Sequence, residues 1–410
     1  MDQLARRLGV PDAVVIGLGS MLGAGIFVVF APAAAAAGGT GLLVALALAG
    51  FIAFCNATSS ARLAARYPES GGTYVYGRER LHPFAGFLAG WGFVIGKTAS
   101  CAAMALTIGA YLWPGQARLV AVAAVVAVTA VNLRGIGKTA GATRILVMLV
   151  LAVLALVVVV GVPDVSIDRI DRIDGSARGV LTAAGLLFFA FAGYARIATL
   201  GEEVREPQRT IPRAVPLALG LVLVTYLILG AVAVGVLGTE RLATSTAPLA
   251  DVVGAAGLPG LEWVVRAGAT IAVTGVLLSL LAGVGRTTLA MARHRDLPAG
   301  LAAVHPRHRV PHRAELAVAA VVIVVVLLSD VRAAIGFSAC TVLVYYAITN
   351  TAALTLGREP ERKLPVQAVA VAGLVGCLLL AVNLPLTSVL AGFSVLALGG
   401  AWYALRSAHR

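Results

Sequence analysis

Four glycines in one long apolar segment are the residues with the clearest chemical potential. Gly17, Gly19, Gly23 and Gly25 fall in the middle of residues 14–30, a run apolar enough to belong to a membrane span. Each glycine costs about 1 kcal/mol relative to alanine inside a helix, so the cluster predicts a local break. A break frees N–H groups that attract a carboxylate and C=O groups that attract a cation.

A second stretch, residues 187–196, has a similar character, with Gly193 among small and aromatic residues. Broken backbone at membrane depth survives only where it is buried in protein or lines a cavity. Two such breaks near the bilayer midplane are typical of the substrate sites of secondary transporters. The pair therefore predicts a binding site for a small molecule that carries both charges.

Lys97 lies near the middle of the apolar residues 83–112, where a lysine costs about 2.5–3.5 kcal/mol to insert. Our hypothesis is that it replaces a coupling cation or contacts an anionic group of the substrate. Because burial penalises the charged form of an amine, such a lysine also suits proton coupling. The alternative is a structural lysine that bonds backbone carbonyls or extends toward the membrane surface.

The elements that must position these groups are membrane helices. The 410 residues are 60% hydrophobic, only 12% charged, and have a mean hydropathy of +0.94, whereas soluble domains carry roughly 25% charged residues. We predict an all-α membrane protein with twelve spans. They cover approximately residues 12–36, 41–61, 83–112, 118–131, 145–162, 179–200, 215–236, 261–292, 314–329, 332–356, 364–381 and 386–405.

The net charge of +13 reflects orientation in the membrane rather than nucleic-acid binding, because the arginines are scattered over short loops. Basic residues favour one side of the predicted topology by about three to one. This bias places both termini in the cytoplasm. The four cysteines are far apart and form no CxxC pair, so we expect neither a metal site nor any other cofactor.

The spans repeat in order. Spans one to five and six to ten both read as a broken helix, a plain helix, a long helix, a short helix and a further helix. Because five is odd, the second set is inverted in the membrane. We expect three units: residues 1–162, residues 163–356, and residues 357–410 with the last two spans.

Four ordered motifs resemble the amino acid–polyamine–organocation (APC) superfamily of permeases. They are residues 19–27, 66–76, 189–194 together with 202–212, and 285–298. The resemblance implies a LeuT-like fold of five-plus-five inverted repeats, with discontinuous helices 1 and 6 and two extra C-terminal helices. It also implies transport of amino acids or related amines.

The resemblance further implies roles for individual residues. N–H groups of Ala24 and Gly25 would receive the substrate carboxylate, and Phe189 would cover the site. The full set of implied substrate contacts is Gly17, Ser20, Met21, Ala24, Gly25, Phe189, Ala192, Gly193 and, from the hypothesis above, Lys97. The carbonyls near Gly17, Met21, Phe189 and Ala192 would receive the ammonium group.

Coupling and gating are assigned to Lys97, Phe189, Tyr194, Arg196 and Ser279. Arg196 either faces the inner pathway or pairs with an acidic residue at 202 or 203. Ser279 either replaces a cation ligand or only packs between helices. The lysine that some proton-coupled relatives carry in helix 5 corresponds here to Val150, so that device is absent.

These observations predict an amino acid permease of the inner membrane that works by alternating access, with proton symport as the favoured coupling. Exchange or uniport remains open, as does a non-transporting sensor or scaffold. An enzyme is disfavoured, because all six histidines fall in predicted loops or in the tail and no acidic residue lies in the middle of a span. Lys97 disfavours cationic substrates by repulsion.

Overall fold

A computed structural model describes residues 8–67, 71–135, 140–170, 175–198, 204–356 and 365–408. Within these ranges the chain forms helices and no β-sheet; one isolated bridge pairs Leu8 with Val204. Residues 202 and 203, one candidate pair of partners for Arg196, lie outside the described residues. The predicted all-helical class is confirmed for the described part of the chain.

Ten helical segments of the described chain are long and apolar enough to cross a membrane. The helices of the first half are α1 (Val10–Met21), α2 (Ala24–Val28), α3 (Phe30–Ala37), α4 (Gly39–Arg66), α5 (Thr73–Arg80), α6 (Pro83–Leu112), α7 (Ala117–Leu133), α8 (Ala140–Gly161) and α9 (Ile167–Ile170). Those of the second half are α10 (Ala177–Phe191), α11 (Ala195–Ala198), α12 (Pro207–Thr244), α13 (Pro248–Ala255), α14 (Glu262–Arg293), α15 (His312–Leu328), α16 (Val331–Thr355), α17 (Pro365–Asn383) and α18 (Leu386–Ala408).

Two of the twelve predicted spans are not among these ten segments. The ninth corresponds to α15, which has 17 residues, and the eleventh to α17, of which Gln367–Asn383 is a shorter apolar helix. One connection also differs from expectation. The seventh span was expected to end near residue 236, but α12 continues to Thr244 across a kink at Gly238, whose φ of 71° suits glycine.

The long helix α6 is the central element of the bundle. It begins after His82, whose ring accepts the N–H of Phe84, and Pro83 occupies its first turn. Its span is the most deeply buried of the ten. Gly90 and Gly96 let α14 and α16 approach closely, because a Cβ at either position would meet Met291 or Thr341. Side chains on α6 therefore face other helices on nearly all sides.

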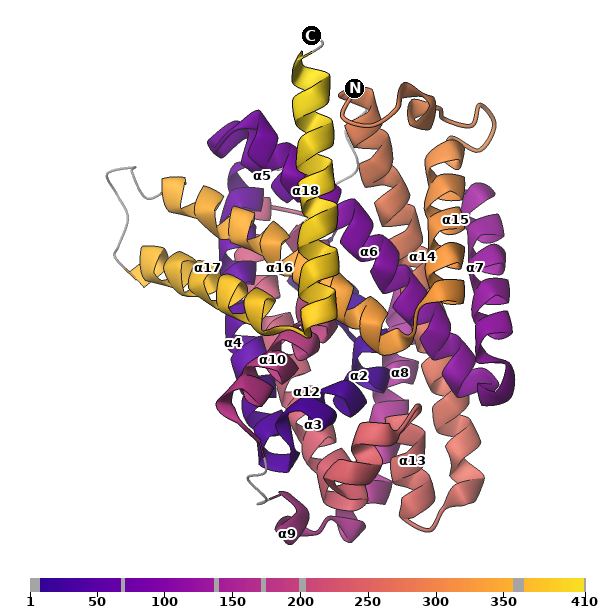
Figure 1. The fold of residues 1–410 in the computed structure, drawn as a ribbon. Helices are drawn as coiled ribbons and strands as arrows, with labels where there is room; N and C mark the ends of the chain where they lie inside the picture. Colours follow the sequence, from indigo (N-terminus) through magenta and orange to yellow (C-terminus); the bar gives the residue numbers. More distant parts are fainter. Residues whose placement is uncertain are drawn as a thin grey trace.

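Both chain ends lie at the same end of the bundle, together with α5, whereas α9 and α13 lie at the opposite end (Figure 1).

At the end that holds the termini, Asp296 follows α14 and is 2% exposed. Its carboxylate pairs with Arg78 of α5 at 3.0 Å and with Arg406 of α18 at 2.8 Å. The hydroxyl of Tyr74 also donates to it at 2.7 Å. Burial, reinforced by this carboxylate, raises the pKa of Tyr74. The carboxylate of Asp296 thus joins α5, α18 and the segment that follows α14.

Candidate substrate site

The first predicted break is present between α1 and α2. Helix α1 ends at Met21, Leu22 and Gly23 leave the helical conformation, and α2 starts at Ala24. The N–H of Gly23 turns back to the carbonyl of Met21 at 2.8 Å. Val29 keeps helical dihedral angles between α2 and α3, so the N–H groups that begin α2 start a longer helical stretch.

The second break takes a different form. Helix α10 ends at Phe191, residues Ala192–Tyr194 form one 3-10 turn, and α11 follows at Ala195. Ala192 and Ala195 both keep right-handed helical angles. The chain is therefore tightened at this position rather than unwound.

The two breaks touch each other through their backbones, and glycine makes the contact possible. A Cβ on Gly25 would lie 2.5 Å from the Cα of Ala190, and a Cβ on Gly193 would lie 2.3 Å from the carbonyl oxygen of Ser20. Real Cβ atoms do not approach backbone so closely. Gly25 of the first break thus packs on the second, and Gly193 of the second packs on the first.

Three tyrosine hydroxyls from other helices satisfy carbonyls at and near the breaks. Tyr226 of α12 donates at 2.7 Å to Met21, and its oxygen also lies 3.2 Å from the carbonyl of Ala190. It therefore bridges both breaks. Tyr111 of α6 donates to Phe27 at 2.7 Å, and Tyr346 of α16 donates to Ala192 at 3.4 Å.

Sequence reasoning missed the roles of Tyr226 and Tyr111. A signal was available, because a tyrosine in an apolar span needs a partner for its hydroxyl. The sequence does not say which carbonyl that partner is. Since a carbonyl oxygen has two lone pairs, the carbonyl of Met21 is fully used by Tyr226 and by the N–H of Gly23.

The structure brings most of the predicted contact residues together around this crossing. Met21, Ala24 and Ala192 are at most 3% exposed, while Ser20, Phe189 and Gly193 are partly exposed. The hydroxyl of Ser20 donates to Ile16 within its own helix at 2.9 Å. Gly17 lies about one turn before the end of α1 and makes room for Ile197 of α11.

Lys97 is buried in α6, with 8% of its surface exposed. Helical periodicity puts it on one stripe with Cys101, Met104 and Tyr111, and Tyr111 reaches the first broken helix. No ion pair joins Lys97 to any described acidic residue. Lys97 thus lies on the α6 face whose C-terminal end contacts α2.

The predicted gating residues fall in different places. Tyr194 is fully buried and its ring lies 5.1 Å from that of Tyr346. Arg196 is exposed on α11, just beyond the second break. Ser279 is exposed on α14, and its hydroxyl donates to Gly275 of the same helix, so the structure does not bring it into contact with the break residues.

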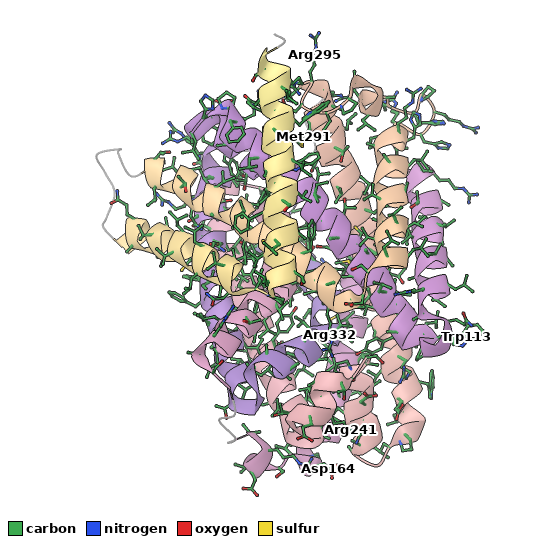
Figure 2. The ribbon with its side chains drawn as sticks, viewed as in Figure 1. Trp113, Asp164, Arg241, Met291, Arg295 and Arg332 are labelled. Carbon is green, nitrogen blue, oxygen red and sulfur yellow. The ribbon has the colours of Figure 1, made fainter. Side chains whose placement is uncertain are left out.

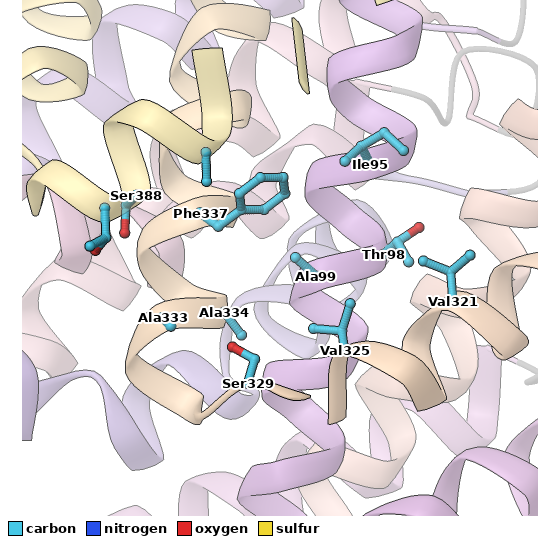
Figure 3. A pocket seen from close by; sticks show the side chains of 12 residues that line it. Ile95, Thr98, Ala99, Val321, Val325, Ser329, Ala333, Ala334, Phe337 and Ser388 are labelled. Carbon is cyan, nitrogen blue, oxygen red and sulfur yellow. The ribbon is translucent and has the colours of Figure 1, made fainter. Parts of the chain in front are cut away.

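A cavity of about 360 Å³ lies elsewhere, among α6, α15, α16 and α18 (Figure 3). Its wall on α6 is formed by Ile95, Thr98 and Ala99, which lie on another side of that helix from Lys97. The lining is mostly apolar and includes no residue of either break. Among the described residues, no group of three His, Cys, Asp or Glu side chains could hold a metal ion.

Comparison with known proteins agrees with this architecture. The amino acid permease family model matches residues 8–398. An uncharacterized transporter of Mycobacterium tuberculosis is 60% identical over 408 residues, which cover 99% of this chain and 92% of that protein. The branched-chain amino acid permease of Bacillus subtilis is 25% identical, covering 75% of this chain and 72% of that protein. The vacuolar cationic amino acid transporter 4 of Arabidopsis thaliana is 26% identical, covering 89% of this chain and 66% of that protein.

The chain therefore belongs to the amino acid permease family of the APC superfamily, as the four sequence motifs indicated. It is an integral membrane protein of the transporter class, and its relatives are named as transporters or permeases rather than enzymes.

Proposed function

We propose that this protein is a proton-coupled amino acid symporter of the inner membrane that works by alternating access. The observation that carries the proposal is the crossing of two interrupted helices at Gly25 and Gly193. N–H groups at Ala24 and Gly25 bind the substrate carboxylate, and carbonyls of Met21 and Ala192 accept its ammonium group, Met21 by releasing one of its two present donors.

We also propose how the helices make up the membrane spans and the two repeats. Ten long apolar helices together with α15 and α17 supply the twelve spans, and α1–α8 and α10–α16 form the two inverted repeats. Both termini face the cytoplasm, consistent with their position at one end of the bundle and with the excess of arginine predicted on that side. The route by which the second break opens is lined by Phe189, Tyr194 and Arg196.

Lys97 is the proposed coupling residue. A buried ammonium group without a carboxylate partner is costly, so either it releases its proton or it pairs with a negative group of the substrate. In the first case it couples transport to protons. In the second it selects substrates with an acidic or neutral side chain over cationic ones. Ser279 has the weaker case for a coupling role, because its hydroxyl is already bonded within α14.

The test is uptake into proteoliposomes of a radiolabelled amino acid panel, with and without an inward proton gradient. Wild type, Lys97→Met and the matched control Lys138→Met, in a predicted loop, are compared. We expect gradient-driven uptake that only the Lys97 variant loses. Uptake that ignores the gradient but speeds up with internal amino acid indicates the alternative, an exchanger. Absence of uptake and binding for the whole panel contradicts amino acid transport and favours a sensor or scaffold.

A further inference from the structure

A dense group of arginines covers the end of the molecule where α14 leads into α15. Arg295 marks this end, opposite Arg241 and Asp164 (Figure 2). We call the group the basic rim. All its members are exposed, and they come from the ends of α7, α14 and α15 and from the loop between the last two: Arg134, Arg293, Arg295, Arg307, Arg309 and Arg313.

The basic rim carries positive charge that the described protein does not neutralise. None of its six side chains forms an ion pair with a described residue. Residues 293–315 contain two acidic residues, Asp296 and Glu315, and both are 2% exposed. Asp296 is already bound by Arg78 and Arg406, and Glu315 packs against the backbone of Gly285 in α14.

The backbone holds the rim in a defined shape. Arg295 and Arg309 have φ angles of 60° and 54°, a left-handed conformation that side chains other than glycine adopt at a cost. The ring of His305 accepts the N–H groups of Arg307 and His308. The N–H of Arg309 returns to the carbonyl of His305 at 2.9 Å. These bonds fix the loop as a folded turn that presents its arginines outward.

The position of the basic rim indicates which kind of molecule it binds. Its arginines flank the ends of the candidate membrane spans Pro114–Leu133 and Pro259–Arg293, and the ends of such spans reach the lipid headgroups. Val304 between them exposes 38% of its surface. Guanidinium groups bind phosphate oxygens in pairs, and clusters of four to eight basic residues next to membrane spans attract anionic lipids. We propose that the basic rim is a binding surface for phosphate headgroups of anionic lipids in the adjacent leaflet.

The experiment is native mass spectrometry of the purified full-length chain in detergent, with phosphatidylglycerol or phosphatidylcholine of the same acyl chains added. Wild type should bind phosphatidylglycerol more tightly than phosphatidylcholine. Replacing three rim residues, R295Q/R307Q/R309Q, should weaken phosphatidylglycerol binding by at least about tenfold. The R295K/R307K/R309K variant keeps the charge and should retain most of the affinity.

The matched control removes three exposed arginines outside the rim, R118Q/R178Q/R241Q. This variant should bind phosphatidylglycerol like wild type. Equal affinity of wild type for the two lipids, or an equal loss in the control variant, overturns the proposal. A short DNA duplex that binds the wild-type protein more tightly than phosphatidylglycerol does also overturns it, in favour of a soluble polyanion. None of these outcomes depends on which solute is transported.

Discussion

The two helix breaks are built differently, although each lies in a glycine-containing apolar helix. The first has two residues outside the helical conformation, Leu22 and Gly23, whereas the second keeps helical angles and tightens into one 3-10 turn. Four glycines surround the first and only Gly193 lies in the second. Unwinding is easier where several residues tolerate unusual dihedral angles, and the second break has one glycine, Gly193.

Because of this difference, the two breaks contribute different groups to the proposed site. The first offers N–H and C=O groups that have left the helix ladder, and these can bind a substrate. The second contributes mainly a close-packed surface, because a 3-10 turn still forms most of its own hydrogen bonds. Tyr226 connects the two, since its hydroxyl lies within hydrogen-bond distance of a carbonyl from each. A substrate that moves one break should therefore move the other.

The largest expected effect comes from adding a methyl group where the breaks touch. Overpacking a tight interior costs about 1–3 kcal/mol, and a clash with backbone lies at the upper end, because backbone cannot rotate away. Gly25→Ala and Gly193→Ala should each lower the rate of uptake by about a hundredfold. The measurement is initial uptake in proteoliposomes at matched protein density.

Gly220→Ala is the matched control for both, since a Cβ at this position of α12 would meet nothing within 4 Å. It should leave uptake unchanged and can raise stability, because alanine favours a helix over glycine by about 1 kcal/mol. If Gly193→Ala is tolerated while Gly25→Ala is not, the second break is looser than its 3-10 turn indicates.

The next effect tests the link between the breaks. Tyr226→Phe removes the hydroxyl that joins the carbonyls of Met21 and Ala190, and the loss of a buried hydrogen bond costs about 0.5–1.5 kcal/mol. We expect kcat/KM for uptake to fall by about tenfold. Tyr346→Phe should cost less, because its bond to Ala192 is long at 3.4 Å. Tyr403→Phe, which removes a hydroxyl far from both breaks, should be neutral; equal losses in all three variants argue against a bridge.

A third variant separates damage to the breaks from general loss of stability. Asp296→Asn removes the charge that binds Arg78 and Arg406. Because both arginines keep contact with water, we expect a cost of about 1–3 kcal/mol, visible as a lower Tm. Uptake per folded molecule should be preserved, since no residue of either break contacts this group. A loss of uptake as large as that of Gly25→Ala would mean that transport depends on this end of the bundle.

The smallest effect is expected at Ser20, which lies beside the first break. Its hydroxyl is already bonded to Ile16 within α1, and such bonds add little to a helix. Ser20→Ala should change KM and kcat by less than about threefold. A large rise in KM would show instead that the hydroxyl leaves its helix to bind substrate, and that the first break uses side chains as well as backbone.

Sequence reasoning located the breaks because glycine acts locally. Gly23 lies in the interruption itself, because glycine lowers helix propensity at its own position, and a buried lysine such as Lys97 is visible in any apolar run. It was less accurate about lengths, as the extension of α12 to Thr244 shows. The kink at Gly238 joins two helices in a region whose moderate hydropathy resembles a surface loop.

The sequence by itself determined the membrane class, the helical architecture, the family and the position of both interruptions, since each depends on hydropathy or on residues close together in the chain. Only the tertiary structure decided which groups meet across the breaks. Tyr226 and Met21 are 205 positions apart, and the contact of Gly25 with Ala190 depends on how two distant helices cross. Partners of this kind are selected by packing, because a hydroxyl or a glycine carries no local record of the backbone that it will approach.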